Sequence, residues 1–337
     1  MNLSAQNELN RRIRETVNRK SSRVVQNLGE GTAILKPAKG QCVIHTEAMV
    51  EGIHFDLTYT TPSELGHRIL AAGLASIAAR GVKPLSASVS LGLRYEQGEI
   101  FVGEFFGGAA RLAQSHKIDL VAENTFPSPS FLVVHLVILA ESGSQKNLVS
   151  KTGAREGHSV FLVGTPGASA AGLTALKRFG RRECESGLGE VLKAHLTPTP
   201  YVKLGMALAK TGEVSAMVEM RDGLSREIYR LTEASSVGAI IDEGEIPSAP
   251  FLQYASQRVG NNLSLWALYG AEDFGLLFTV KPKGIKKVKS LLKRQKVPHG
   301  IIGEICAASQ KVKLKNLQGD MIPLLPRIWT HYARRAS

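Results

Sequence analysis

Residues 61–84 carry the strongest helix signal of the chain and set the packing around it. Thr61 can cap the helix, Pro62 fits the first helical position, and Glu64 can complete a capping box. Gly81 and Pro84 then end the helix. Many side chains in between are alanine or glycine, so we expect a neighbouring element to approach the helix closely.

Hydrophobic patterning around this helix predicts a self-contained α+β unit in the first half of the chain. We expect a second helix over 97–115 and four strands at 42–46, 85–93, 118–122 and 131–140, with a loop at 123–129. Residues 141–158 are polar and contain three glycines, which is typical of a domain boundary. We therefore predict an N-terminal domain over 1–145 and a C-terminal domain over 150–337.

The second half alternates strands and helices and predicts an α/β domain. Strands are expected at 159–164, 216–220, 237–241, 276–280, 299–306 and 311–315, and helices after 165–172, over 197–209, within 250–268 and over 283–294. Asp222 follows one of these strands as either a helix N-cap or a ligand, and the cap is the favoured interpretation. The fold class is α/β overall.

Bulk properties limit the possible partners. No apolar run approaches the length of a membrane span, the N-terminus has no apolar core of a secretory signal, and three scattered cysteines favour a reducing cytoplasm. The 42 Lys and Arg against 29 Asp and Glu favour anionic partners. We interpret most of this charge as solvated surface, because the basic residues of 283–294 occupy one face of an amphipathic helix without interleaved aromatics, which makes nucleic-acid binding unlikely.

Residues 45–55 look like a functional site, because two carboxylates and two histidines lie within eleven residues after a strand. Five segments, taken in order, also form a pattern over nearly the whole chain: Val50–Phe55, Thr61–Pro84, Asp222–Leu224, Gly270–Phe278 and Trp329–Tyr332. This pattern resembles the thiamine-monophosphate kinase family, which belongs to a superfamily with aminoimidazole ribonucleotide synthetase and selenophosphate synthetase.

The resemblance implies an aminoimidazole ribonucleotide synthetase-like two-domain fold. In that family, the four N-terminal strands pair with those of a second copy to form a barrel across a homodimer. ATP lies with its phosphates on several Mg²⁺ ions held by aspartates, and direct phosphoryl transfer yields thiamine diphosphate. Such chemistry depends on positioning and charge neutralisation, for which Mg²⁺ and hard carboxylate oxygens are suited.

The chain departs from the family pattern at five presumed metal-ligand positions. The corresponding segments are Gly29-Glu30-Gly31 for G-D-D, Thr46-Glu47 for T-D, Ala75-Ser76 for S-D, Ala122-Glu123-Asn124-Thr125 for G-G-D-T, and Glu219-Met220-Arg221-Asp222 for D-x-S-D. Serine and asparagine bring no negative charge to offset a metal ion, and Arg221 would replace part of the metal's role or repel the metal.

Carried over position by position, the resemblance implies a set of site residues. They are catalytic Asp222 and Arg221; cofactor-binding Glu30, Thr46, Glu47, Asn124 and Gly164; substrate-binding His54, Glu51, Asp273 and Trp329; and metal-binding Glu30, Glu47, Asp222 and Glu219. A structural role of His54 beside the strand is equally consistent with the sequence.

Three functions remain open at this point. The first is an ATP-dependent kinase of thiamine phosphate that works with fewer Mg²⁺ ions. The second, favoured by the lost aspartates, is a catalytically impaired paralogue that binds a nucleotide or phosphate ligand as a dimer. The third is an enzyme of the same fold with another substrate. Nucleic-acid binding rests on charge alone and has the least support.

Overall fold

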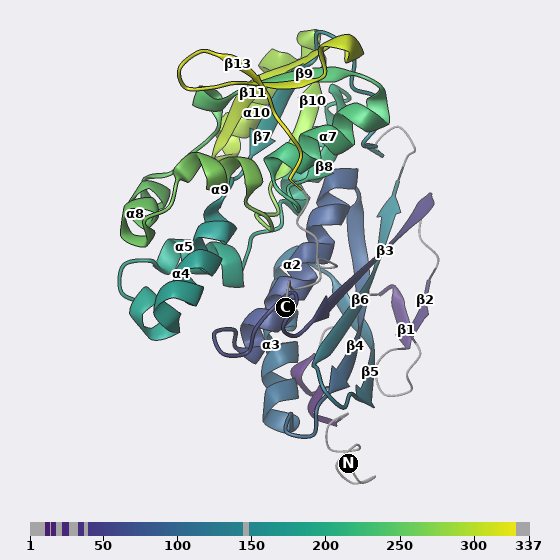
Figure 1. Cartoon of the computed structure of the whole chain (residues 1–337). Helices are drawn as coiled ribbons and strands as arrows, with labels where there is room; N and C mark the ends of the chain where they lie inside the picture. Colours follow the sequence, from purple (N-terminus) through teal and green to yellow (C-terminus); the bar gives the residue numbers. More distant parts are fainter. Residues whose placement is uncertain are drawn as a thin grey trace. The chain divides into compact units, whose positions relative to one another are not determined.

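The computed structural model describes residues 11–13, 15–17, 22–26, 33–36, 40–143 and 148–327. Glu30 and Trp329, both expected in the site, lie outside the described residues. The chain forms two compact units, here called the N-terminal unit (residues 1–77 and 82–145) and the C-terminal unit (residues 78–81 and 146–337). Both are drawn in Figure 1.

The N-terminal unit is built on a four-stranded sheet in the order β3-β6-β4-β5. Its strands are β3 (Gln41–Val50), β4 (Lys83–Leu93), β5 (Asp119–Pro127) and β6 (Val133–Ser142). Strands β4 and β5 run parallel, and the other neighbours run antiparallel. A short pair, β1 (Val24–Gln26) with β2 (Ile34–Leu35), completes the described strands of this unit.

Helix α2 (Pro62–Arg80) packs closely against its surroundings, as its small side chains predict. A Cβ atom on Gly66 would lie 2.0 Å from the carbonyl oxygen of Phe105 in helix α3 (Glu99–His116). On the sheet side, a Cβ atom on Gly73 would meet Ile138 and Leu136 of β6 at 2.8 Å. The two helices therefore lie against each other and against one face of the sheet (Figure 1).

The capping box at the start of α2 is confirmed. The backbone N–H of Thr61 donates to Glu64 Oε2 at 2.9 Å, and the backbone N–H of Glu64 donates back to Thr61 Oγ1 at 3.3 Å. This reciprocal pairing satisfies amide groups that a helix N-terminus otherwise leaves without partners.

Two expectations about the N-terminal strands are wrong. Strand β3 continues to Val50, so Glu47 lies inside a strand and not beyond its end. The expected loop at 123–129 is strand β5 as far as Pro127, because Glu123 and Asn124 pair in parallel with Val89 and Ser90 of β4. Parallel pairing joins segments distant in sequence, and no local pattern announces it.

The C-terminal unit contains a seven-stranded sheet in the order β13-β12-β9-β11-β7-β10-β8. The strands are β7 (Ser159–Val163), β8 (Val214–Glu219), β9 (Gly238–Asp242), β10 (Leu276–Val280), β11 (His299–Cys306), β12 (Val312–Lys315) and β13 (Met321–Pro323). Neighbouring strands are antiparallel except for the parallel pair β12 and β9. Leucine, isoleucine and valine side chains of these strands form the core with helix α7.

The described helices of this unit are α4 (Ala168–Cys184), α5 (Gly189–Leu196), α6 (Val202–Lys210), α7 (Leu224–Ser235), α8 (Pro250–Val259), α9 (Leu263–Tyr269) and α10 (Ile285–Gln295). The helix expected from 197 starts only at Val202, because its two prolines leave residues 197–200 as a loop. Helix α5 and strand β13 were not predicted.

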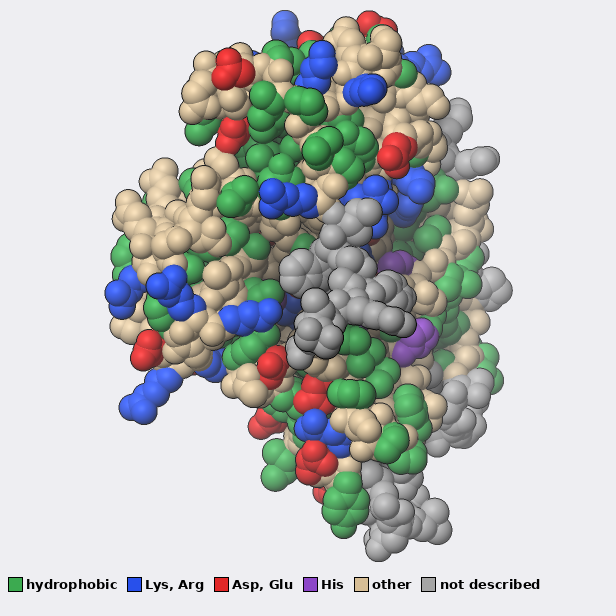
Figure 2. Space-filling model, in the orientation of Figure 1, with side chains coloured by type: hydrophobic (Ala, Val, Ile, Leu, Met, Phe, Trp, Pro, Cys, Tyr) green, Lys and Arg blue, Asp and Glu red, His purple; other side chains and the backbone are tan. Residues whose placement is uncertain are grey.

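Helix α10 is amphipathic, as its pattern predicts. Val288 and Leu292 are fully buried, whereas its lysines are exposed. Lys287 Nζ donates to the carbonyl oxygen of Thr211 at 2.8 Å, just after helix α6 ends. On the face seen in Figure 2, Lys and Arg side chains are spread among polar and apolar ones and form no single stripe. No helix in the described part of the chain is long and apolar enough to cross a membrane.

Candidate functional site

The loop between α9 and β10 has an unusual backbone. Glu272 and Phe274 adopt left-handed conformations, with φ of 65° and 51°, on either side of Asp273. Such conformations cost free energy in residues other than glycine and gather at functional sites. The amide of Glu272 donates to the Arg221 carbonyl at 2.6 Å, and that of Phe274 donates to the Met220 carbonyl at 2.9 Å. The loop is thereby fixed to the segment that follows β8.

Asp273 occupies the N-terminus of helix α4. Its carboxylate accepts hydrogen bonds from the amides of Gly167 at 2.7 Å and Ser169 at 2.9 Å. Gly167 has a φ of 87°, and a Cβ atom there would lie 2.6 Å from the Trp266 backbone, so the turn that presents these amides requires glycine. Burial raises the pKa of Asp273 to about 7, although the backbone hydrogen bonds act in the opposite direction.

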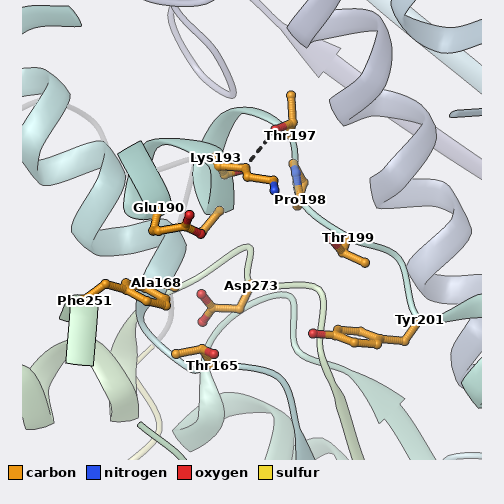
Figure 3. Close-up of a pocket in the computed structure, with 11 residues that line it drawn as sticks. Thr165, Ala168, Glu190, Lys193, Thr197, Pro198, Thr199, Tyr201, Phe251 and Asp273 are labelled. Carbon is orange, nitrogen blue, oxygen red and sulfur yellow. Dashed lines mark hydrogen bonds between the residues drawn. The ribbon is translucent and has the colours of Figure 1, made fainter. Parts of the chain in front are cut away.

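The Asp273 carboxylate points into a cavity of about 220 Å³ within the C-terminal unit (Figure 3). Helix α5, the loop after it and the starts of α4 and α8 supply the walls. The lining residues are Thr165, Ala168, Glu190, Lys193, Ala194, Thr197, Pro198, Thr199, Tyr201, Phe251 and Asp273. Burial, with a smaller effect of the Asp273 charge, raises the pKa of Tyr201. The cavity is the best-formed binding site that the described C-terminal unit offers.

A buried pair of side chains holds helices α4 and α5 together behind this cavity. Ser169 Oγ lies 3.0 Å from His195 Nδ1, and both residues are almost fully buried. Helix contact is close here, since a Cβ atom on Gly172 would lie 2.1 Å from the Val191 carbonyl oxygen. The cavity wall is therefore rigidly packed.

The segment after β8 places two carboxylates beside two arginines. Arg221 Nε lies 3.6 Å from Glu219 Oε1, and Arg230 lies 2.5 Å from Asp222 Oδ2. Arg230 also contacts the buried Glu227 at 3.0 Å. The guanidinium of Arg221 lies over the Phe274 ring, 5.7 Å from its centroid. These contacts link the segment to the Asp273 loop.

The preferred interpretation of Asp222 as a helix cap is wrong. Gly223, with a φ of 91°, occupies the N-cap position of α7, and the Asp222 amide donates to Glu227 Oε1 at 2.9 Å. Burial is the main cause that raises the pKa of Glu227 to about 7, and Arg230 opposes it. The Asp222 carboxylate itself is engaged by Arg230.

The residues expected at the ATP site of the N-terminal unit lie on opposite faces of the sheet. Glu47 is partly buried and its Oε2 lies 3.4 Å from His45 Nε2. Thr46 and Asn124 are exposed on the other face, as alternation along β3 and β5 requires. Glu123, not singled out from the sequence, is buried on the inner side of β5.

Glu51 and His54 stabilise the turn after β3. Glu51 pairs with Arg94 at 3.0 Å and accepts from the Leu132 amide at 3.0 Å. His54 Nδ1 accepts from the Val50 amide at 3.1 Å. Both side chains therefore have structural contacts, which agrees with the alternative structural reading of His54.

Gly164 allows two loops of the C-terminal unit to meet. It has a φ of 110°, and a Cβ atom there would lie 3.3 Å from the Cα atom of Gly275. Its amide donates to the Pro298 carbonyl at 2.9 Å. Its position next to the Asp273 loop shapes the end of β7 beside the cavity.

The expected metal ligands do not gather within either unit. Glu47 belongs to the N-terminal unit, and Glu219 and Asp222 belong to the C-terminal unit. Among the described residues, no three His, Cys, Asp or Glu side chains form a group that could hold a metal ion. Sequence reasoning also missed Arg230, whose i,i+3 spacing from Glu227 on a helix was the available signal.

Comparison with known proteins identifies the family. Models of the AIR synthase related protein N-terminal and C-terminal domains match residues 29–139 and 155–315. The chain is 30% identical to thiamine-monophosphate kinase of Escherichia coli over 292 residues, 86% of this chain and 87% of that protein. It is 27% identical to the Buchnera aphidicola (Schizaphis graminum) enzyme over 90% of this chain and 92% of that protein.

Solved structures give the same result. The thiamine-monophosphate kinase of Stenotrophomonas maltophilia matches with a TM-score of 0.81 at 25% identity, over 90% of this chain and 94% of that chain. AaThiL in complex with AMPPCP and TMP matches with a TM-score of 0.76 at 25% identity, over 98% and 99%. These matches confirm the aminoimidazole ribonucleotide synthetase-like two-domain fold. The chain belongs to the thiamine-monophosphate kinase family, within the AIR synthase related proteins.

Proposed function

We propose that this chain binds a nucleotide or a thiamine phosphate in the manner of its family, but has lost most magnesium-dependent phosphoryl transfer. One observation carries the proposal. The two carboxylates that stand at family metal positions in the C-terminal unit, Glu219 and Asp222, are each paired with an arginine, Arg221 and Arg230.

These ion pairs do not fit a magnesium site. Mg²⁺ requires near-octahedral oxygen ligands at about 2.0–2.1 Å, and a cation brought to Asp222 would meet the guanidinium of Arg230. Displacing Arg230 would also remove the cation next to Glu227, which is 1% exposed. Leaving a buried carboxylate without its partner costs several kcal/mol, on the order of 3–5.

The capacity to bind a phosphate has separate support. The guanidinium of Arg221 is only partly buried, with 23% of its side-chain surface exposed, and arginine suits phosphate oxygens. A family relative, AaThiL, has been solved with AMPPCP and TMP. ATP and thiamine phosphate are therefore the ligands to test first.

A turnover assay tests this function. Purified protein is incubated with ATP, MgCl₂ and thiamine monophosphate, and thiamine diphosphate is quantified, with the Escherichia coli kinase as the positive control. We expect a rate at least about a hundredfold below that control, since one missing charge-stabilising group already costs about 10²–10³ in rate. Calorimetry with ATP alone should still show binding without MgCl₂.

Two results would contradict the proposal. Turnover comparable with the control and abolished by Asp222→Ala would establish a working kinase. Absence of nucleotide and thiamine phosphate binding, in protein shown by circular dichroism to be folded, would exclude the binding role. An Asp320→Ala variant serves as a control, because Asp320 lies in the exposed turn before β13.

A further inference from the structure

The cavity around Asp273 is poorly suited to an anion. Its lining carries two carboxylates, Asp273 and Glu190, against one ammonium, Lys193. Helix N-termini often bind phosphate, but here the amides of Gly167 and Ser169 already donate to Asp273. A phosphate in this cavity would face a carboxylate where it needs donors.

The cavity instead offers hydrogen-bond acceptors to its occupant. A carboxylate has about four acceptor positions, and the amides at the start of α4 use only part of them. Asp273 is half-buried, and Figure 3 shows its carboxylate directed toward the space between Glu190, Thr165 and Phe251. A ligand with N–H donors would complete the pairing of this group.

The remaining walls suit a flat ring. Phe251, Pro198, Ala168 and Ala194 supply apolar surface. At about 220 Å³ the cavity is smaller than the roughly 300–1,000 Å³ of sites for larger ligands, which limits the occupant to one compact ring system or one end of a longer molecule.

We propose that this cavity binds a heterocycle with an aminopyrimidine edge, in which an exocyclic amino group lies beside a ring nitrogen, and that Asp273 pairs with both positions. One carboxyl oxygen accepts from the amino group, and the proton shared with the ring nitrogen completes the second hydrogen bond. The adenine ring and the pyrimidine ring of thiamine both carry this edge. The pairing involves no metal and no phosphate, so it stands independently of the proposed function.

The pair needs one proton between Asp273 and the ring nitrogen. Burial raises the pKa of Asp273 to about 7, so the acid form is available at neutral pH. The other titratable or charged groups around it are Tyr201, Glu190, Lys193 and Glu272. Glu272 raises this pKa further, whereas the α4 amides lower it. Binding is therefore expected to weaken as the pH rises above 7.

The test is a ligand-observed NMR titration of the full chain with 4-aminopyrimidine and, as a matched ligand, unsubstituted pyrimidine. We expect 4-aminopyrimidine to bind at least about tenfold more tightly, because a lost hydrogen bond to a charged group costs about 1.5–3 kcal/mol. Adenosine and thiamine form the second arm, and the tighter of the two identifies the source of the ring. Neither carries a phosphate, so failure here leaves the proposed function untouched.

Protein variants localise the binding. Asp273→Ala should weaken 4-aminopyrimidine at least about tenfold, whereas Asp320→Ala, the same change in an exposed turn, should not. Ala194→Phe fills the cavity from α5 without touching the carboxylate, and it decides the matter where Asp273→Ala does not fold. Equal affinity for the two pyrimidines, or unchanged binding in Ala194→Phe, would overturn the proposal.

Discussion

At the scale of single residues, Arg221 marks how far this chain has moved from its family's pattern. It lies between Glu219, with which it pairs, and the Phe274 ring, over which its guanidinium lies. Restoring the family's D-x-S-D pattern with Glu219→Asp and Arg221→Ser removes one cation and shortens one carboxylate. We expect magnesium-dependent turnover to rise at least about tenfold, since developing phosphoryl charge would again be met by metal.

The measurement is thiamine diphosphate formation at several MgCl₂ concentrations. Arg226→Ser, which removes a cation from the first turn of α7, is the matched control and should leave turnover unchanged. If the restored pattern gives no gain and no dependence on MgCl₂, the ion pairs are not what limits the chemistry.

Glu227 gives the chain a pH-dependent stability. Its pKa is about 7 in the folded protein against a model value of 4.5, so the folded state holds this proton more tightly than the unfolded state does. The stability linked to it is full below about pH 4.5 and is lost as the pH rises through 7. Glu227→Gln should flatten this part of the profile, with an effect on the order of 1–3 kcal/mol.

Urea denaturation between pH 5 and 8, followed by circular dichroism, measures the slope for wild type and Glu227→Gln. Asp273 contributes a slope of the same sign, because its pKa is raised in the same way. The comparison of the two proteins isolates Glu227. An unchanged slope in the variant would show that Arg230 compensates the burial fully.

At the scale of elements, the close contact of α2 and α3 depends on glycine. A Cβ atom on Gly108 would lie 1.8 Å from the Ser63 carbonyl oxygen, and the backbone cannot give way cheaply. Gly108→Ala should therefore destabilise the protein by about 2–4 kcal/mol, although alanine is the better helix former. Gly98→Ala is the control, since nothing lies within 4 Å of its added carbon. Equal unfolding midpoints would refute this packing.

What the sequence predicts well at this scale is local. The Thr61 and Glu64 capping box and the buried side of α10 depend on residues within one or two turns. The continuation of β5 through Asn124 depends on β4, some 30 residues away, and it was missed. The cavity was missed for the same reason, because Asp273 reaches the start of α4 only through the tertiary fold.

At the scale of the whole molecule, the resemblance implies a homodimer through the N-terminal sheet, and this stays a prediction. The sheet face opposite the helices is apolar in part: Ile44 of β3 is 65% exposed and Phe126 of β5 is 40% exposed. Exposed apolar surface of this kind marks interaction sites. A second copy pairing its own sheet here would cover it.

Ile44→Glu should therefore separate the dimer without unfolding the chain, because a charge buried in the joined sheets would lie without a partner. Light scattering after size-exclusion chromatography should give twice the chain mass of 36.3 kDa for wild type and the single mass for the variant. Leu317→Glu is the matched control, since Leu317 is 64% exposed in the C-terminal unit and should leave the dimer intact. A monomeric wild type, or a dimeric Ile44→Glu, would place the subunit contact elsewhere or remove it.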